Sequence, residues 1–308
     1  MRRRRWLALV AVVALAVLAA LVVVGAAELL GDGEPETQAN GETPIEPSKL
    51  PRGGRSLFPD RRVVAFYGAP QAPELGTLGI GPPGRAARRL ERQARAYSRS
   101  DRPVLPAFEL IATIVQSDSG DDGDHAARQE PRTIARYLRV ARRNKMLLIL
   151  DIQPGYAPFI KEVHALRRFL REPDVSVALD PEWSLEAPAL PGQEIGSTNA
   201  ATINEISAYL SRIVRRYRLP EKLLVVHRFT DDMIENERAL KEYPGVALTV
   251  NVDGFGDRPN KISRYHSFTR GRRDRHHGFK LFYNEDINLM PARRVLSLRP
   301  APELVVYE

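Results

Sequence analysis

Residues 175–184, VSVALDPEWS, hold a short apolar run that ends at two carboxylates. The run VSVAL suits a buried strand, and Asp180 and Glu182 follow it with one proline between them. Side chains at positions i and i+2 of an extended chain point to the same side, so the two acids are predicted to share one face. The place of this run among the other apolar runs of the chain decides the fold.

Eight short apolar runs, each bounded by turn residues, recur from residue 61 to residue 308. They are VVAFYGAP (63–70), PVLPAFELIATI (103–114), MLLILDIQPG (146–155), VSVALDPEW (175–183), KLLVVHRFT (222–230), VALTVNVDGF (246–255), FKLFYNED (279–286) and ELVVYE (303–308). Most of them are continuous rather than alternating, which is typical of parallel strands buried on both faces.

Amphipathic stretches that favour helices separate these runs. Apolar residues recur at three- and four-residue spacing in residues 84–97, 131–144, 157–170, 198–218 and 230–243. Suitable residues for helix starts are Pro131, Ser197 or Thr198, and Thr230 or Asp231. The last two connections are less clearly helical. Eight strands, most of them separated by helices, in about 250 residues predict a (β/α)8 TIM barrel. An open, doubly wound sheet is the alternative, but the GxGxxG pattern at residues 79–84 (GIGPPG) contains two prolines and does not follow the first run directly.

The N-terminus predicts a membrane segment. Four arginines precede an uninterrupted apolar stretch from Trp6 to Ala27, which is long enough to cross a bilayer with the arginines in the cytoplasm. We expect a transmembrane anchor or signal peptide over residues 1–30, a flexible Pro-, Gly- and Glu-rich linker over 31–60 and the barrel over 61–308. The barrel would then lie outside the cytoplasm, anchored to the membrane, or secreted if cleavage occurs at the small residues 24–26.

Composition excludes several classes of protein. The chain has no cysteine, which excludes disulfides, thiolate metal sites and a cysteine nucleophile. Its formal net charge of +8 includes the four N-terminal arginines, so the remainder is too mildly basic to predict nucleic-acid binding. The six histidines show no HxxxH or HExxH spacing, and GxSxG is absent. We therefore predict neither a zinc hydrolase nor a serine hydrolase, and neither a metal nor another cofactor.

Polar residues close most of the apolar runs, at the end where a (β/α)8 barrel carries its functional residues. The predicted site consists of Tyr67, Glu109, Asp151, Gln153, Asp180, Glu182, Trp183, His227, Asn251, Asp253, Tyr283 and Glu285, while Tyr307 and Glu308 end the eighth run. A ring of carboxylates suits glycoside cleavage or the binding of a divalent metal. Neighbouring carboxylates repel, so Glu182 is predicted to have a raised pKa and to donate a proton, with Asp180 as its partner.

Structural roles compete with these functional ones. The two acids could close a strand-end turn by accepting backbone hydrogen bonds, and Trp183 could pack against the rim rather than stack on a sugar. His227 could bind only a neighbouring loop, and Asp253 could belong to a tight turn between glycines.

The motif LDPEW (179–183) resembles the D-x-E signature of two families of barrel enzyme, the family 25 (Chalaropsis-type) lysozymes and the family 18 chitinases. In both families the Glu of the motif is the general acid and the Asp assists it, so the resemblance implies these roles for Glu182 and Asp180. The chain departs from family 18 at Ala178, where a further Asp is usual, and from family 25 at FYG (66–68), which lacks an Asp. The second catalytic carboxylate is left open among Asp253, Glu285 and Glu109.

We therefore predict a membrane-tethered, extracytoplasmic glycoside hydrolase that acts on a peptidoglycan-type glycan or another polysaccharide of the cell envelope or the environment. The alternative is a non-catalytic barrel that binds an envelope glycan or scaffolds a partner, which the missing Asp of the first run supports. A metal-dependent phosphodiesterase is a third hypothesis, based on the ring of acids.

Overall fold

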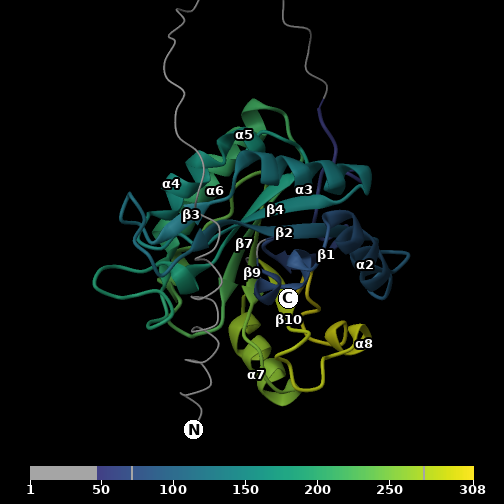
Figure 1. Ribbon diagram of the computed structural model, residues 1–308. Coiled ribbons are helices and arrows are strands. Elements are labelled where there is room, and N and C mark those ends of the chain that lie inside the picture. The colour runs from purple at the N-terminus through teal and green to yellow at the C-terminus, as the bar shows by residue number, and fades with distance from the viewer. Residues whose placement is uncertain (1–46, 71, 273–274) are drawn as a thin grey trace, which may run out of the picture. The chain divides into compact units, whose positions relative to one another are not determined.

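The computed structural model describes residues 47–70, 72–272 and 275–308, in which eight parallel strands form a closed barrel (Figure 1). The barrel strands are β1 (Arg62–Gly68), β2 (Val104–Val115), β4 (Leu147–Ile152), β5 (Val175–Leu179), β7 (Lys222–Arg228), β9 (Val246–Val252), β10 (His276–Leu281) and β11 (Leu304–Tyr307). They pair in chain order, and β1 closes the ring by pairing with β11. The predicted (β/α)8 fold and all eight predicted strands are confirmed.

Helices cover the outside of the barrel. They are α2 (Pro83–Arg95), α3 (Pro131–Arg143), α4 (Phe159–Ala165), α5 (Arg167–Leu170), α6 (Ala200–Arg216), α7 (Arg258–Thr269) and α8 (Ala292–Val295). In Figure 1, α3, α5 and α6 lie above the strands, and α7 and α8 lie below them. Pro131 begins α3 as predicted. The cap of α6 is Asn199 rather than Ser197 or Thr198, because its side chain accepts a hydrogen bond from the Thr202 N–H.

The helix predicted over residues 230–243 is wrong. This segment holds only the short strand β8 (Ile234–Glu235) and a single 3-10 turn, η4 (Glu237–Ala239). Glu237 is buried and forms ion pairs with Arg228, Arg272 and Arg275 at 2.9–3.0 Å. Asn236 has a φ of 53°, a left-handed conformation that interrupts a helix. Contacts to arginines elsewhere in the chain therefore override the local helical pattern.

Side chains of the barrel strands alternate between the interior and the helix layer. Along most strands the inward residues are mainly apolar at first, and a polar side chain lies near the carboxyl end; Ser176 of β5 and Thr249 of β9 are polar inward residues that lie earlier. The apolar inward residues form one core cluster that includes Val63, Ala65, Leu105, Ala107, Leu147, Ile149, Leu223, Val225, Leu304 and Val306. The outward residues form a second cluster beneath the helices. This alternation places a packed core at one end of the barrel and polar groups at the other.

The predicted linker ends earlier than expected. Leu50, Leu57 and Phe58 are buried and belong to the interior core cluster. The Leu57 N–H donates to Glu221 Oε2 at 2.7 Å, and the compact unit begins at Ser48. Residues 48–60 therefore pack at the N-terminal ends of the strands, although their Pro- and Gly-rich composition predicted a tether.

The predicted membrane segment (residues 1–30) and the first part of the predicted linker lie outside the described residues. Within the described ranges, no helix is both long enough and apolar enough to cross a bilayer.

Candidate active site

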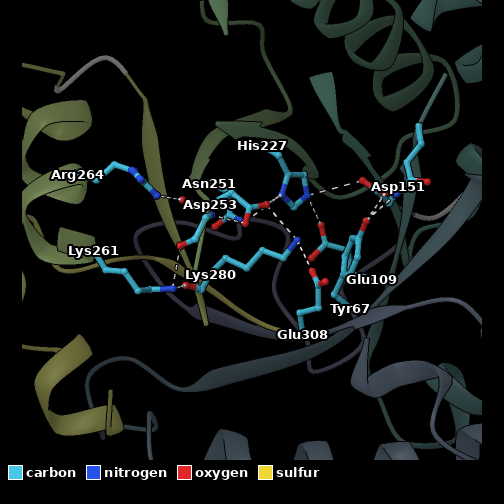
Figure 2. Close-up of polar contacts among 12 residues, drawn as sticks. Tyr67, Glu109, Asp151, His227, Asn251, Asp253, Lys261, Arg264, Lys280 and Glu308 are labelled. Carbon is cyan, nitrogen blue, oxygen red and sulfur yellow. Dashed lines mark hydrogen bonds and ion pairs between the residues drawn. The ribbon is translucent and has the colours of Figure 1, made fainter. Parts of the chain in front are cut away.

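The carboxyl ends of the strands bring together side chains that are far apart in the sequence (Figure 2). We call this set the mouth ring. It consists of Tyr67, Glu109, Asp151, Asp180, His227, Asn251, Asp253, Lys280 and Glu308. Apart from Glu308, every member is at most 8% exposed. Seven of the nine were predicted as site residues from the sequence.

His227 lies at the centre of the mouth ring. Its Nδ1 is 2.8 Å from Asp253 Oδ2, and its Nε2 is 3.0 Å from Glu109 Oε1 and 3.7 Å from Asp151 Oδ1. Burial alone would lower the pKa of His227, but the hydrogen bonds to Asp253 and Glu109 raise it well above its ordinary value. These contacts therefore favour the protonated imidazole, which donates to one carboxylate on each side.

Lys280 is the second cation of the mouth ring. Its Nζ is 3.0 Å from Asp253 Oδ2 and 2.6 Å from Glu308 Oε2, and it lies 3.9 Å from the centroid of the Tyr67 ring. Burial alone would lower the pKa of Lys280, but Asp253 and Glu308 raise it well above its ordinary value. Burial raises the pKa of Glu308 to about 7 in spite of this ion pair. Neither Lys280 nor Glu308 was among the predicted site residues, although Glu308 was recognised as the end of the last strand.

Lys280 could have been found from the parity of its strand. Residues of β10 alternate, and Gly278 lies against the inward Asn251, so Lys280 also points inward. A charged residue at an inward position of an apolar run is the signal that was missed.

Gln153 and Tyr67 position Asp151. The Tyr67 hydroxyl donates to Asp151 Oδ2 at 3.2 Å, and Gln153 Nε2 donates to the same hydroxyl at 3.2 Å. Gln153 Oε1 in turn accepts from the Val115 N–H at 3.1 Å. Burial and then Asp180 raise the pKa of Asp151 well above its ordinary value.

Asp180 and Glu182 lie directly after β5. The chain there forms a 3-10 turn, η3 (Pro181–Trp183), so the same-face argument from an extended chain does not hold beyond Asp180. The two carboxyls nevertheless interact, because burial and then Asp180 raise the pKa of Glu182 well above its ordinary value. Asp253 raises the pKa of Glu182 further and Lys280 lowers it, and Glu182 itself is half-buried. The Gly196 N–H donates to the Glu182 carbonyl oxygen at 2.8 Å and supports the turn.

Besides Gln153 and Glu182, three predicted site residues are not members of the mouth ring: Trp183, Tyr283 and Glu285. β10 ends at Leu281, so Tyr283 and Glu285 belong to the loop that follows. Tyr283 is 37% exposed and stacks on Tyr307 with ring centroids 5.2 Å apart. Tyr283, Glu285 and the ring member Glu308 line a cavity of about 530 Å³. Trp183 is half-buried in the η3 turn. Substrate contact by Trp183, Tyr283 and Glu285 stays a prediction.

A larger cavity, of about 1780 Å³, lies at the opposite end of the barrel. Pro59, Glu221, Gly245 and Glu303, which precede strands, line it together with residues of α7. No member of the mouth ring lines it. Because barrel enzymes of this fold place their chemistry at the carboxyl ends of the strands, the mouth ring is the better candidate for an active site.

Comparison with known proteins adds no family assignment. No family model and no curated protein matches the chain. Among solved structures, the chain is similar to a hyperthermophilic endo-β-1,4-glucanase in complex with substrate, with 10% identity, a TM-score of 0.46 and coverage of 81% of this chain and 89% of that one. It is also similar to the spore coat polysaccharide biosynthesis protein SpsE from Bacillus subtilis, with 10% identity, a TM-score of 0.44 and coverage of 80% and 59%. Likeness at this level carries no argument about function, so the proposal below depends on the mouth ring.

Proposed function

We propose that this barrel hydrolyses glycosidic bonds of a polysaccharide, with Glu182 as the general acid and Asp180 as its partner. The observation that carries the proposal is that the surroundings raise the pKa of Glu182 and lower the pKa of Asp253 at the same end of the barrel. Burial and then Asp180 raise the pKa of Glu182. Burial alone would also raise the pKa of Asp253, but Lys280 and His227 hold it below its ordinary value. Carboxyl groups whose environments push their pKa values apart suit the roles of proton donor and charge stabiliser.

In the proposed reaction, protonated Glu182 gives its proton to the leaving glycosidic oxygen as the bond to the anomeric carbon breaks. Ionised Asp253 stabilises the positive charge that develops on the sugar ring. A water molecule then gives its hydroxyl to the anomeric carbon and its remaining proton to Glu182.

Asp253 is the best of the three candidates for the second carboxylate. Lys280 and His227, which contact its Oδ2 at 3.0 and 2.8 Å, keep it ionised at neutral pH. Glu109 is fully buried and bound to His227, and Glu285 lies outside the mouth ring.

The substrate class and the location belong to the same proposal. The arginines and the apolar stretch of residues 1–30 would anchor the chain in the cell membrane with the barrel on the outer side. Envelope polysaccharides such as peptidoglycan, or polysaccharides of the environment, are the substrates available there. If the N-terminal segment is cleaved, the barrel is secreted and meets the same substrates.

Replacement of Glu182 by Gln tests the proposal. The full-length chain in detergent is incubated with peptidoglycan fragments and chitin-type oligomers, and new reducing ends are counted. Glu182→Gln should lower the rate at least about 100-fold, the scale of a general acid's contribution. Glu186→Gln, the same change at an exposed residue of the same loop, should keep the wild-type rate.

Two results would contradict the proposal. Equal hydrolysis by wild type and Glu182→Gln would remove Glu182 from the acid role. Equal glycan binding by both proteins, with no product from either, would favour the non-catalytic, glycan-binding alternative.

A further inference from the structure

Three side chains of the mouth ring converge in a way that acid–base catalysis at Glu182 does not require. Glu109 on β2, Asp151 on β4 and His227 on β7 each offer one ligand atom, and these atoms all lie within 4.8 Å of one another. All three side chains are at most 1% exposed. Because each projects from a barrel strand, their positions are fixed by the sheet rather than by a loop.

Two carboxylate oxygens of this group accept no hydrogen bond in the described part of the chain. They are Glu109 Oε2 and Asp151 Oδ1, both buried. The other oxygen of each group is occupied, since Glu109 Oε1 accepts from His227 and Asp151 Oδ2 accepts from Tyr67. A buried carboxylate oxygen is normally bound by a donor or a metal ion. These two oxygens therefore indicate a bound ligand, and this observation is independent of the clustering of the acids.

The surrounding contacts orient the three side chains in the manner of metal ligands. Asp253 binds His227 Nδ1 at 2.8 Å, which leaves Nε2 facing the two carboxylates. A histidine that ligates a metal typically donates its other ring N–H to a carboxylate in this way, and ligating carboxylates are themselves hydrogen-bonded. Tyr67 provides that second contact for Asp151 (Figure 2).

The charges of the site also favour a bound cation. Six carboxyls surround the mouth: Glu109, Asp151, Asp180, Glu182, Asp253 and Glu308. Lys280 and His227 are the cations that form ion pairs with carboxyl groups of this set in the described chain. A divalent ion between Glu109 and Asp151 would balance the charge of these two carboxylates.

We propose that Glu109, Asp151 and His227 bind one small divalent ion of the first transition row, such as Zn²⁺ or Mn²⁺. Two ligands that each lie about 2.0–2.2 Å from a tetrahedral zinc ion are about 3.3–3.6 Å apart. His227 Nε2 lies 3.7 Å from Asp151 Oδ1, which is close to that separation. Its 3.0 Å contact with Glu109 Oε1 is a hydrogen bond, and a bound ion would take the place of the proton on Nε2. Ca²⁺ is a poorer fit because it prefers six to eight oxygen ligands at about 2.3–2.6 Å.

The sequence predicted no metal site because the ligands come from separate strands. Glu109 and His227 are 118 residues apart, so no short spacing motif could indicate them. This inference is independent of the proposed hydrolysis, since it concerns the binding of an ion and not the acid role of Glu182.

Calorimetric titration tests the site. The full-length chain in detergent is treated with a chelator, dialysed and titrated with ZnCl₂, MnCl₂ or CaCl₂ alone. We expect one saturable site per chain for zinc or manganese and none for calcium. Asp151→Asn and Glu109→Gln, which keep side-chain size, should each weaken binding at least tenfold. His164→Gln, which removes an exposed histidine, should bind as wild type does.

Circular dichroism of each variant shows whether it is folded before it is titrated. If either substitution prevents folding, Asp253→Asn replaces it, and this change should weaken binding about tenfold through the orientation of His227. The proposal is overturned if the wild type shows no saturable binding of zinc or manganese, or if every folded variant binds as tightly as the wild type. The two proposals can be separated. Hydrolysis that depends on Glu182 and persists after chelation would support the proposed function, whether or not the titration detects a bound ion.

Discussion

Replacement of Lys280 by Met should destabilise the barrel strongly. Lys280 is 4% exposed, and its Nζ lies 3.0 Å from Asp253 Oδ2 and 2.6 Å from Glu308 Oε2. Methionine keeps the apolar stem and removes the ammonium, so both carboxyls lose a buried partner. Breaking such a pair costs about 3–5 kcal/mol. We expect about 3 kcal/mol at pH 5, the low end of this range, because Asp253 keeps its hydrogen bond with His227.

The loss should grow as the pH rises. The pKa of Glu308 is about 7 beside Lys280, against an ordinary value of 4.5, and removal of the ammonium raises it further. A carboxyl with a raised pKa in the folded state contributes stability that is fully present below its unfolded pKa and is lost as the pH rises through the folded pKa. The variant therefore loses more stability than the wild type between pH 7 and pH 8. A further rise of one pKa unit corresponds to about 1.4 kcal/mol.

Urea unfolding at pH 5 and pH 8, followed by circular dichroism, measures both effects. With a denaturant slope of about 3 kcal/mol per molar, a loss of about 3 kcal/mol lowers the midpoint by about 1 M. Lys241→Met, at an exposed lysine, should change the free energy of unfolding by less than about 0.5 kcal/mol. A Lys280→Met midpoint within about 0.2 M of wild type, or a loss that does not grow from pH 5 to pH 8, would refute the reasoning.

Three other changes test the packing around the site. Gly196→Ala places a Cβ 2.6 Å from the Pro181 carbonyl oxygen, so it should slow hydrolysis and lower the free energy of unfolding by about 1–3 kcal/mol. Gly84→Ala is the control. Its Cβ meets nothing within 4 Å, so it should raise the free energy of unfolding by up to about 1 kcal/mol. Leu57→Ala should cost about 2–5 kcal/mol by urea unfolding, and a loss below about 1 kcal/mol would show that residues 48–60 are not part of the barrel core. Burial lowers the pKa of Lys222 from 10.5 to about 7. The folded protein therefore resists protonation of this amine, and its free energy of unfolding falls as the pH falls from 10.5 to 7. The stability of wild type relative to Lys222→Met should therefore rise by about 3 kcal/mol from pH 7 to pH 9.5, and a constant difference would contradict the burial of a charged lysine.

The fold and most of the mouth ring could be predicted because both depend on local pattern. A strand buried on both faces has apolar residues at most positions, so each of the eight apolar runs predicts one barrel strand. Glu109, Asp151 and His227 were then found because polar residues at the carboxyl ends of barrel strands meet at one mouth. No knowledge of the side-chain contacts was needed for this step.

The remaining features depend on contacts between distant parts of the chain. Inside the barrel, Lys280 is stabilised by ion pairs with Asp253, which follows β9, and with Glu308, which follows β11. Glu237 holds residues 230–243 out of a helix through ion pairs with arginines on β7 and near β10. Residues 48–60 have the composition of a linker, yet Leu57 is fully buried in the core. In each case the local pattern does not contain the partner that decides the structure.

The dependence of the rate on the leaving group tests the role of Glu182 most directly. A general acid matters most when the leaving oxygen is basic, and little when the leaving group is an acidic phenol that needs no proton. The rates of wild type and Glu182→Gln are compared on the natural oligomer and on the dinitrophenyl glycoside of the sugar that the oligomer assay identifies. We predict a loss of at least about 100-fold on the oligomer and less than about tenfold on the dinitrophenyl glycoside. An equal loss on both substrates would contradict the assignment of Glu182 as the proton donor.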